Sequence, residues 1–115
     1  NGAKILVLGV AYKKDIDDIR ESPALKIIDS LHKNQAEVVY HDPYVPTFQI
    51  SGENEKTLQS LVLTEEEIAG ADCVLILSDH TCVDYQWVAD HARLILDTRN
   101  ATKNVQKGKE KITKI

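Results

Sequence analysis

Short apolar runs separated by polar stretches set the pattern of this chain. Residues 4–10, 73–77 and 94–96 are almost continuously apolar, and residues 38–40 and 61–63 form shorter runs of the same kind. Each run is too short for a helix and rich in strand-forming residues. Continuous apolar runs, rather than alternating ones, are typical of parallel strands covered on both faces. The pattern therefore predicts about five strands in a mainly parallel sheet.

Apolar residues at helical spacing lie between these runs. They predict a helix over residues 23–33, opened by a proline whose missing N–H costs nothing at a first helical position. Thr64 and Glu67 have the spacing of a capping box and predict a short helix ending near residue 70. A third helix is predicted over residues 84–92. The polar stretch 43–61 is predicted to be irregular.

Alternating strands and helices predict the fold class. Parallel neighbours need crossover connections, so we expect a three-layer α/β/α, Rossmann-like domain. In such sheets ligands bind beyond the carboxyl ends of the strands, where the strand order reverses. For the common order that point lies between the first strand and the strand at residues 73–77. The long charged loop at residues 9–22 is then expected to overhang it, beside residues 78–80.

Length and charge narrow the picture further. With 115 residues the chain suits one domain, and we expect that domain to span residues 1–102. This part carries a net charge of −8, whereas residues 103–115 carry +4. An acidic body is a poor partner for nucleic acid, which rewards a basic face. The basic tail is predicted to be a solvated, frayed terminus.

Other features bear on location and completeness. No apolar run approaches the ~20 residues that cross a bilayer, and no secretion signal opens the chain, so we expect a cytoplasmic protein without a membrane partner. Cys73 and Cys82 are expected to be reduced thiols, Cys73 in the core. The chain has no methionine and begins at Asn1-Gly2, which suggests a piece of a longer polypeptide.

The loop at residues 9–22 offers two interpretations. It has neither a G-x-G-x-x-G nor a G-x-x-x-x-G-K-[ST] motif, so a glycine cradle for phosphate is not expected. Lys13, Lys14 and Arg20, with the free N–H groups of the following helix start, could hold a diphosphate. The loop's three aspartates could instead pair with these bases as ordinary surface ion pairs.

Longer stretches carry a family resemblance. "GVAYKKDIDDIRESPALKIIDSL", "EVVYHDPYVP", "ADCVLILSDH" and "LILDTRNATK" resemble the C-terminal, UDP-binding domain of the UDP-glucose/GDP-mannose dehydrogenase family. The wording looks most like the UDP-N-acetylglucosamine 6-dehydrogenase branch, with UDP-glucose as the alternative substrate. The resemblance implies an NAD-dependent enzyme that oxidises the C6 alcohol of a UDP-sugar to a carboxylate in two steps. It also implies partners in the same polypeptide, an N-terminal NAD-binding domain and a central dimerisation region, and a homo-oligomeric parent.

The resemblance also implies site residues. Tyr12 and Lys13 are expected to contact the UDP-sugar, and Arg20 to reach NAD across the cleft between domains. Arg99 is expected to contact substrate from the string after the last strand, where Thr98 stands in place of the family's glycine. The family's catalytic cysteine lies elsewhere, so no catalytic residue is assigned, and the isolated chain is expected to be inactive.

Some interpretations stay open at this level. His41 and Asp42 are adjacent on a strand and point to opposite faces, so a structural use is favoured over a ligand pair. His80 follows the strand at residues 73–77, near the predicted ligand site, and is a candidate for binding, although a binding role is not the favoured interpretation. A stand-alone nucleotide-binding module of flavodoxin-like shape is the alternative from another functional class.

Overall fold

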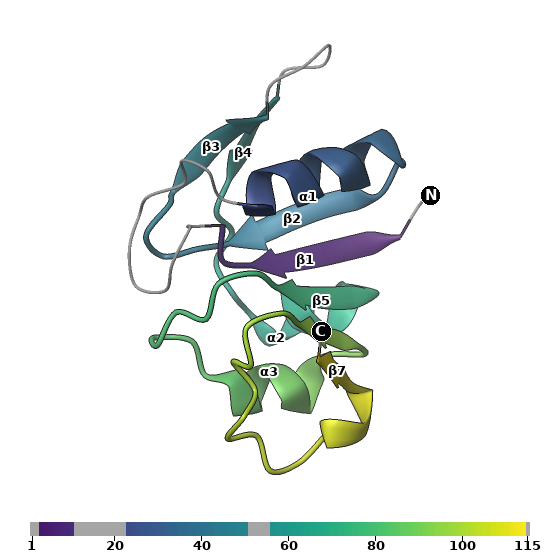
Figure 1. Ribbon diagram of the computed structural model, residues 1–115, viewed down its shortest axis with the longest axis vertical. Helices are drawn as coiled ribbons and strands as arrows, with labels where there is room; N and C mark the ends of the chain where they lie inside the picture. Colours follow the sequence, from purple (N-terminus) through teal and green to yellow (C-terminus); the bar gives the residue numbers. More distant parts are fainter. Residues whose placement is uncertain (1–2, 11–22, 51–55, 115) are drawn as a thin grey trace.

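A five-stranded parallel sheet forms the middle of the domain (Figure 1). The computed structural model describes residues 3–10, 23–50 and 56–114. Along the sheet the strands are β2 (Glu37–His41), β1 (Lys4–Leu8), β5 (Cys73–Ile76), β6 (Ile95–Asp97) and β7 (Ile112–Lys114). The predicted parallel sheet of about five strands is confirmed.

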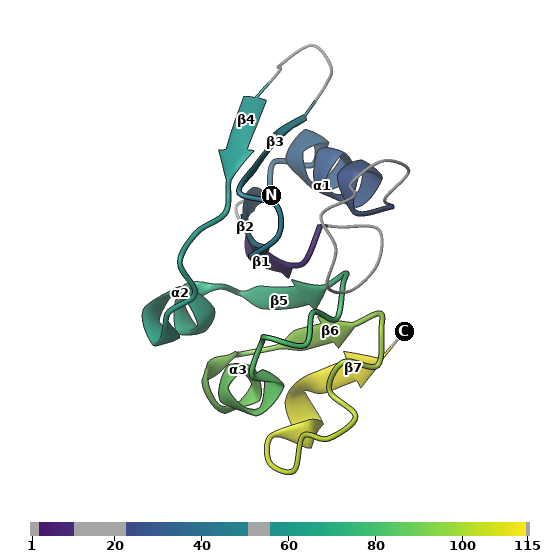
Figure 2. The same ribbon diagram turned by 90° about the vertical axis from the view of Figure 1, so that its left-hand side faces the viewer.

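Helices cover both faces of this sheet. Helix α1 (Pro23–Lys33) lies on one face, and α2 (Glu65–Gly70) and α3 (Tyr85–His91) lie on the other (Figure 2). Val7 packs in the same core cluster as Ile28 of α1, whereas its neighbours Leu6 and Leu8 pack with the second cluster, which holds Ile68 and Val88 of the other two helices. Successive residues of a strand point to opposite faces, so one apolar run serves both cores. The three-layer α/β/α prediction is confirmed.

Side-chain caps explain where the short helices begin. Thr64 Oγ1 accepts a hydrogen bond from Glu67 N at 3.1 Å, and Asp84 Oδ1 accepts one from Trp87 N at 3.1 Å. Each bond satisfies a backbone N–H that the first turn leaves without a partner. The Glu67 carboxylate lies 3.6 Å from Lys4 Nζ.

No helix in the described ranges is both long and apolar enough to cross a bilayer.

The stretch between β2 and α2 differs from the prediction. Residues 43–61 contain an antiparallel hairpin, β3 (Thr47–Ile50) with β4 (Lys56–Gln59), which projects from the sheet (Figure 1). The strand predicted at residues 61–63 is wrong. The chain leaves the sheet after Ser60, which makes an isolated bridge to Tyr40, and Val62 is 79% exposed. Leu61 N donates to Tyr40 O at 2.9 Å, but the segment forms no ladder beyond this point. An apolar run of three residues becomes a strand only where a neighbouring strand pairs with it.

The basic tail is also ordered, so its prediction as a frayed terminus is wrong. Ile112 of β7 pairs with Ile95 of β6, which makes β7 an edge strand of the main sheet. Lys111 Nζ donates to Ala89 O at 2.8 Å and to Ala92 O at 2.9 Å. A cation at the carboxyl end of α3 satisfies free carbonyls and complements the helix dipole. The tail's charge is therefore partly used in holding α3.

Candidate nucleotide-binding edge

The strand order reverses beside β1. β2 lies on one side of β1 and β5 lies on the other. This is the predicted switch point, and the segments that leave it define what we call the carboxyl edge: residues 9–10, 42–44, 78–80 and 97–99. In open α/β sheets this edge is where ligands bind.

The turn after β1 is shaped by Gly9. Its φ is +85°, a left-handed conformation that favours glycine, and its N–H donates to His41 O at 3.0 Å. A Cβ at this position would lie 2.5 Å from Ser78 Cβ and 2.7 Å from Ser78 O. The glycine therefore allows β1 and the end of β5 to approach each other closely.

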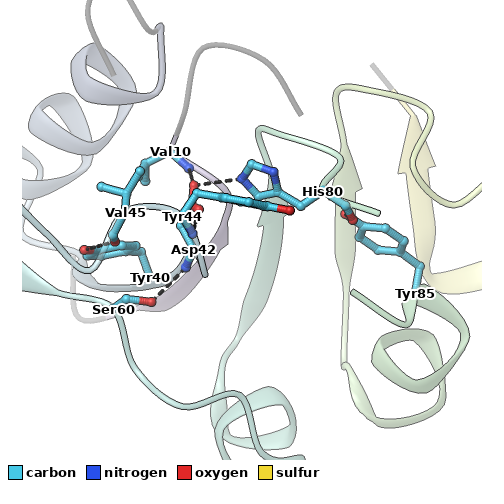
Figure 3. A network of polar contacts seen from close by, with 8 residues as sticks. All are labelled: Val10, Tyr40, Asp42, Tyr44, Val45, Ser60, His80 and Tyr85. Atoms are coloured by element: carbon cyan, nitrogen blue, oxygen red, sulfur yellow. Dashed lines mark hydrogen bonds and ion pairs between the residues drawn. The ribbon is translucent and has the colours of Figure 1, made fainter. Parts of the chain in front are cut away.

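A buried carboxylate joins the ends of three strands. Asp42 Oδ2 accepts hydrogen bonds from Val10 N at 2.8 Å and from His80 Nε2 at 2.9 Å, while Oδ1 accepts one from Tyr44 N at 2.8 Å (Figure 3). Asp42 is 0% exposed and His80 is 1% exposed. Burial alone would raise the pKa of Asp42, but the hydrogen bonds from His80, Val10 and Tyr44 outweigh it and leave that pKa lowered.

Two further hydrogen bonds hold the loop after β2 in place near the Asp42 carboxylate. Tyr40 Oη donates to Val45 O at 2.8 Å, and Asp42 N donates to Ser60 Oγ at 2.8 Å (Figure 3). Burial, with the Asp42 charge as a second cause, raises the pKa of Tyr40 to about 12. The phenol therefore stays protonated and keeps its role as a donor to the loop.

A second buried carboxylate shapes the loop that carries Arg99. Asp97 Oδ1 accepts from Arg99 N at 2.9 Å and Ala101 N at 3.0 Å, and Oδ2 accepts from Thr102 N at 2.8 Å and Thr102 Oγ1 at 2.6 Å. Burial would raise the pKa of Asp97, but these hydrogen bonds, led by the Thr102 hydroxyl, leave it lowered. Arg99 is exposed at the end of β6. Its backbone position is thus set by a rigid turn.

Thr98 fits where the family's string has glycine. Its Oγ1 donates to Ile76 O at 2.7 Å, so the side chain is used against β5. The left-handed residue of this turn is Asn100, with φ 58°, and Thr98 is not among the described residues with positive φ. The turn therefore does not require glycine at position 98.

A hollow of about 350 Å³ lies one strand further along the edge, between the loops that follow β5 and β6. Its lining is mixed, and its polar residues include Asp79, Thr81, Asp84, Asn100, Lys103 and Asn104. The hollow borders the carboxyl edge at Asp79, beside β5. The hollow is therefore next to the ligand site that was predicted between β1 and β5, on the same edge of the sheet.

The predicted site residues divide into two groups. Tyr12, Lys13 and Arg20 lie outside the described residues. Arg99 follows β6 at the carboxyl edge, and its contact with the substrate stays a prediction. Cys73 is buried and Cys82 exposed, both as free thiols. No group of three or more metal-ligating side chains occurs among the residues that the structure describes.

The Asp42–His80 pair was not predicted as a unit. Asp42 directly follows β2 and His80 comes four residues after the end of β5, and both strands flank β1. The pair could have been predicted from the sequence, because polar residues that follow nearby strands of the expected sheet lie close together at the carboxyl edge. His41 turns the other way, and its Nδ1 bonds with Leu61 O at 2.8 Å, a structural use as expected.

Fold and edge together define a Rossmann-like α/β domain with a ligand edge at the carboxyl ends of its parallel strands. The sequence profile described as "UDP-glucose/GDP-mannose dehydrogenase family, UDP binding domain" matches residues 6–104. The chain therefore belongs to this family of dehydrogenases, as its UDP-binding domain.

Named relatives agree with this membership. A UDP-N-acetyl-D-mannosamine dehydrogenase of Methanococcus vannielii is 38% identical over 77 residues, which cover 67% of this chain and 16% of that protein. Its namesake from Pyrococcus horikoshii is 37% identical over 106 residues, covering 88% of this chain and 22% of that protein. The solved structure of a UDP-D-ManNAc dehydrogenase from P. horikoshii superimposes with a TM-score of 0.71 at 32% identity, over 99% of this chain and 25% of that one. The chain thus spans about a fifth of the curated relatives' length.

Proposed function

We propose that this chain is the UDP-sugar-binding domain of an NAD-dependent nucleotide-sugar 6-dehydrogenase whose substrate is a UDP-N-acetylhexosamine, oxidised at C6 to the uronic acid. Membership of the UDP-binding family supports the nucleotide half of the proposal. The sugar half rests on relatives named for UDP-N-acetyl-D-mannosamine rather than for UDP-N-acetylglucosamine or UDP-glucose. The substrate to assay first is therefore UDP-N-acetyl-D-mannosamine.

Cations at the carboxyl edge would hold the UDP-sugar. The observation that carries this most directly is the Asp97 turn, because it holds the Arg99 backbone firmly at the end of β6. A guanidinium forms paired hydrogen bonds with phosphate oxygens, and a lysine adds a point charge. In the proposal Arg99 approaches the ligand from β6, and Tyr12 and Lys13 approach it from the segment after β1. With strands about 4.8 Å apart, the ends of β1 and β6 are about 10 Å from each other.

NAD is assigned to another domain of the same polypeptide. The chain has no G-x-G-x-x-G motif, and in the described residues Gly9 lies against Ser78. In the proposal Arg20 alone reaches NAD from this domain, and NAD accepts the hydride in the oxidation of the alcohol. This chain then supplies one wall of the cleft and has no turnover by itself. The other wall and the contacts of a homo-oligomer belong to the NAD-binding and dimerisation regions.

Substitutions of the proposed binding residues, with a control at the opposite end of β6, test the proposal. Arg99→Ala and Lys13→Ala, made in a dehydrogenase that carries this chain as its UDP-binding domain, should each raise KM for the UDP-sugar by about tenfold or more. Arg93→Ala is the matched control, because Arg93 is also an exposed arginine but precedes β6, at the opposite edge of the sheet. Unchanged KM in both Arg99→Ala and Lys13→Ala would refute the assigned site.

A substrate panel tests the sugar. The proposal expects higher kcat/KM with UDP-N-acetyl-D-mannosamine or UDP-N-acetylglucosamine than with UDP-glucose. A preference for UDP-glucose would contradict the acetylhexosamine assignment and leave the UDP-binding role standing.

A further inference from the structure

The Asp42 side chain has an arrangement of partners that only a carboxylate can serve. Among the described residues, N–H donors converge on it from Val10, Tyr44 and His80, and they use both oxygens. An asparagine of the same shape offers one acceptor oxygen, so its NH2 group would face at least one of these N–H groups. A buried charge is costly unless it is hydrogen-bonded, and here the bonds come from the ends of β1, β2 and β5.

His80 is itself held in place from two directions. Its ring packs on the Tyr44 ring, with 4.8 Å between the centroids, and its carbonyl accepts a hydrogen bond from Tyr85 Oη at 3.1 Å (Figure 3). Tyr85 begins α3, and Tyr44 follows β2. The imidazole therefore cannot turn away from Asp42 without breaking this packing, and its Nε2–H stays directed at the carboxylate.

The pair acts on the point where the chain leaves β1. The Val10 N–H is fixed by Asp42 at 2.8 Å, and the preceding residue, Gly9, is pressed against Ser78. Tyr12 and Lys13 follow Val10 by two and three residues. The pair therefore fixes the peptide at Val10, the last described residue of the carboxyl edge before residues 11–22.

We propose that Asp42 and His80 are positioning residues for the UDP-sugar. They do not touch the ligand; they fix the chain at Val10 to the loops that follow β2 and β5, and so set the shape of the carboxyl edge. This inference rests on the proposed function, because it takes the carboxyl edge as the UDP-sugar site. It adds that the binding edge is prepared by a buried carboxylate–imidazole pair before any ligand arrives.

Graded substitutions in the same dehydrogenase test this role. Asp42→Asn should raise KM for UDP-N-acetyl-D-mannosamine by about tenfold while kcat and KM for NAD change far less, because misplacing a binding group by a small distance costs one to two orders of magnitude. His80→Ala should act in the same direction. His80→Gln should restore a KM near that of the wild type, because the glutamine Nε2 can donate where the imidazole Nε2 did.

A structural role alone would give a different pattern. Val88→Ala, in the core cluster on the other face, is the control for lost stability. If Asp42→Asn and Val88→Ala lower the unfolding midpoint equally and neither changes KM, the positioning role is overturned. The role is also overturned if His80→Gln shows the same KM as His80→Ala. Should His80→Ala not fold, the comparison of His80→Gln and Asp42→Asn with the wild type decides.

The result with Lys13→Ala separates this inference from the proposed function. If Lys13→Ala raises KM and Asp42→Asn does not, the positioning inference fails and the binding site stands. If neither raises KM and Arg99→Ala also has no effect, the proposed function itself fails, and the positioning role fails with it.

Discussion

A Cβ on Gly9 would lie 2.5 Å from the Cβ of Ser78, a separation that real Cβ atoms essentially never show. The two residues bring the exits of β1 and β5 together at the point where the strand order reverses. Gly9 also has a left-handed backbone, with φ +85°. Close approach and backbone conformation therefore both require glycine at this position.

Gly9→Ala should lower the free energy of unfolding by about 3 kcal/mol, from backbone strain and overpacking together. Gly70→Ala is the control, because nothing lies within 4 Å of its added Cβ and its φ is not in the positive range. A small gain is expected there, since alanine favours a helix. Urea denaturation of both variants measures the difference. Equal midpoints for the two variants would contradict the close contact.

The Asp97 carboxylate should make stability depend on pH in the acid range. Its pKa in the folded state is lowered from the ordinary value of 3.8. Stabilisation from a lowered pKa is fully present above the unfolded-state pKa and is lost as the pH falls through the folded-state pKa. The difference in unfolding free energy between wild type and Asp97→Asn should therefore be constant from about pH 5 to 7 and shrink below about pH 4.

Thr102→Val provides a graded check on the same carboxylate. It removes the hydroxyl that donates to Asp97 at 2.6 Å and leaves the backbone donors in place. Its difference from the wild type should also shrink in acid, but by less than for Asp97→Asn. Urea denaturation across the pH range measures both. A difference for Asp97→Asn that does not change down to about pH 2 would show that Asp97 has no lowered pKa.

Lys111 should contribute to stability through α3. Lys111→Met removes the hydrogen bonds to Ala89 O and Ala92 O and should cost about 1–2 kcal/mol. Lys109→Met, in the same short turn, changes the net charge equally but removes no side-chain hydrogen bond seen among the described residues. Thermal unfolding of the two variants gives the comparison. If both variants lose the same stability, the loss comes from the change in net charge and not from the hydrogen bonds of Lys111 to α3.

The elements that could be predicted are those with a local signal. The apolar runs that became β1 and β5, and the Thr64 cap of α2, depend on neighbouring residues alone. Strand β7 carries one apolar residue among lysines, and it became a strand through pairing with β6. The β3–β4 hairpin likewise depends on the pairing of two four-residue segments of mixed polarity. Neither pairing could be deduced from composition or periodicity.

The candidate site shows the same division. Arg99 could be placed at the carboxyl edge because it directly follows the last predicted strand. Asp42 and His80 are 38 residues apart and meet only because β2 and β5 flank β1. The residue types of the charged loop at residues 9–22 left two interpretations open, and the roles of Tyr12, Lys13 and Arg20, which the family resemblance implies, remain predictions.

Binding of UDP itself to this chain tests the central claim most directly. In 1H–15N spectra of the labelled chain, titrated with UDP to millimolar concentration, the largest shift changes should fall on the amides of Val10, Asp79 and Arg99, at the carboxyl edge. Amides at the opposite edge, such as Ala36 and Asp72, should change little. Shift changes gathered at that opposite edge, or none anywhere in the spectrum, would contradict the account.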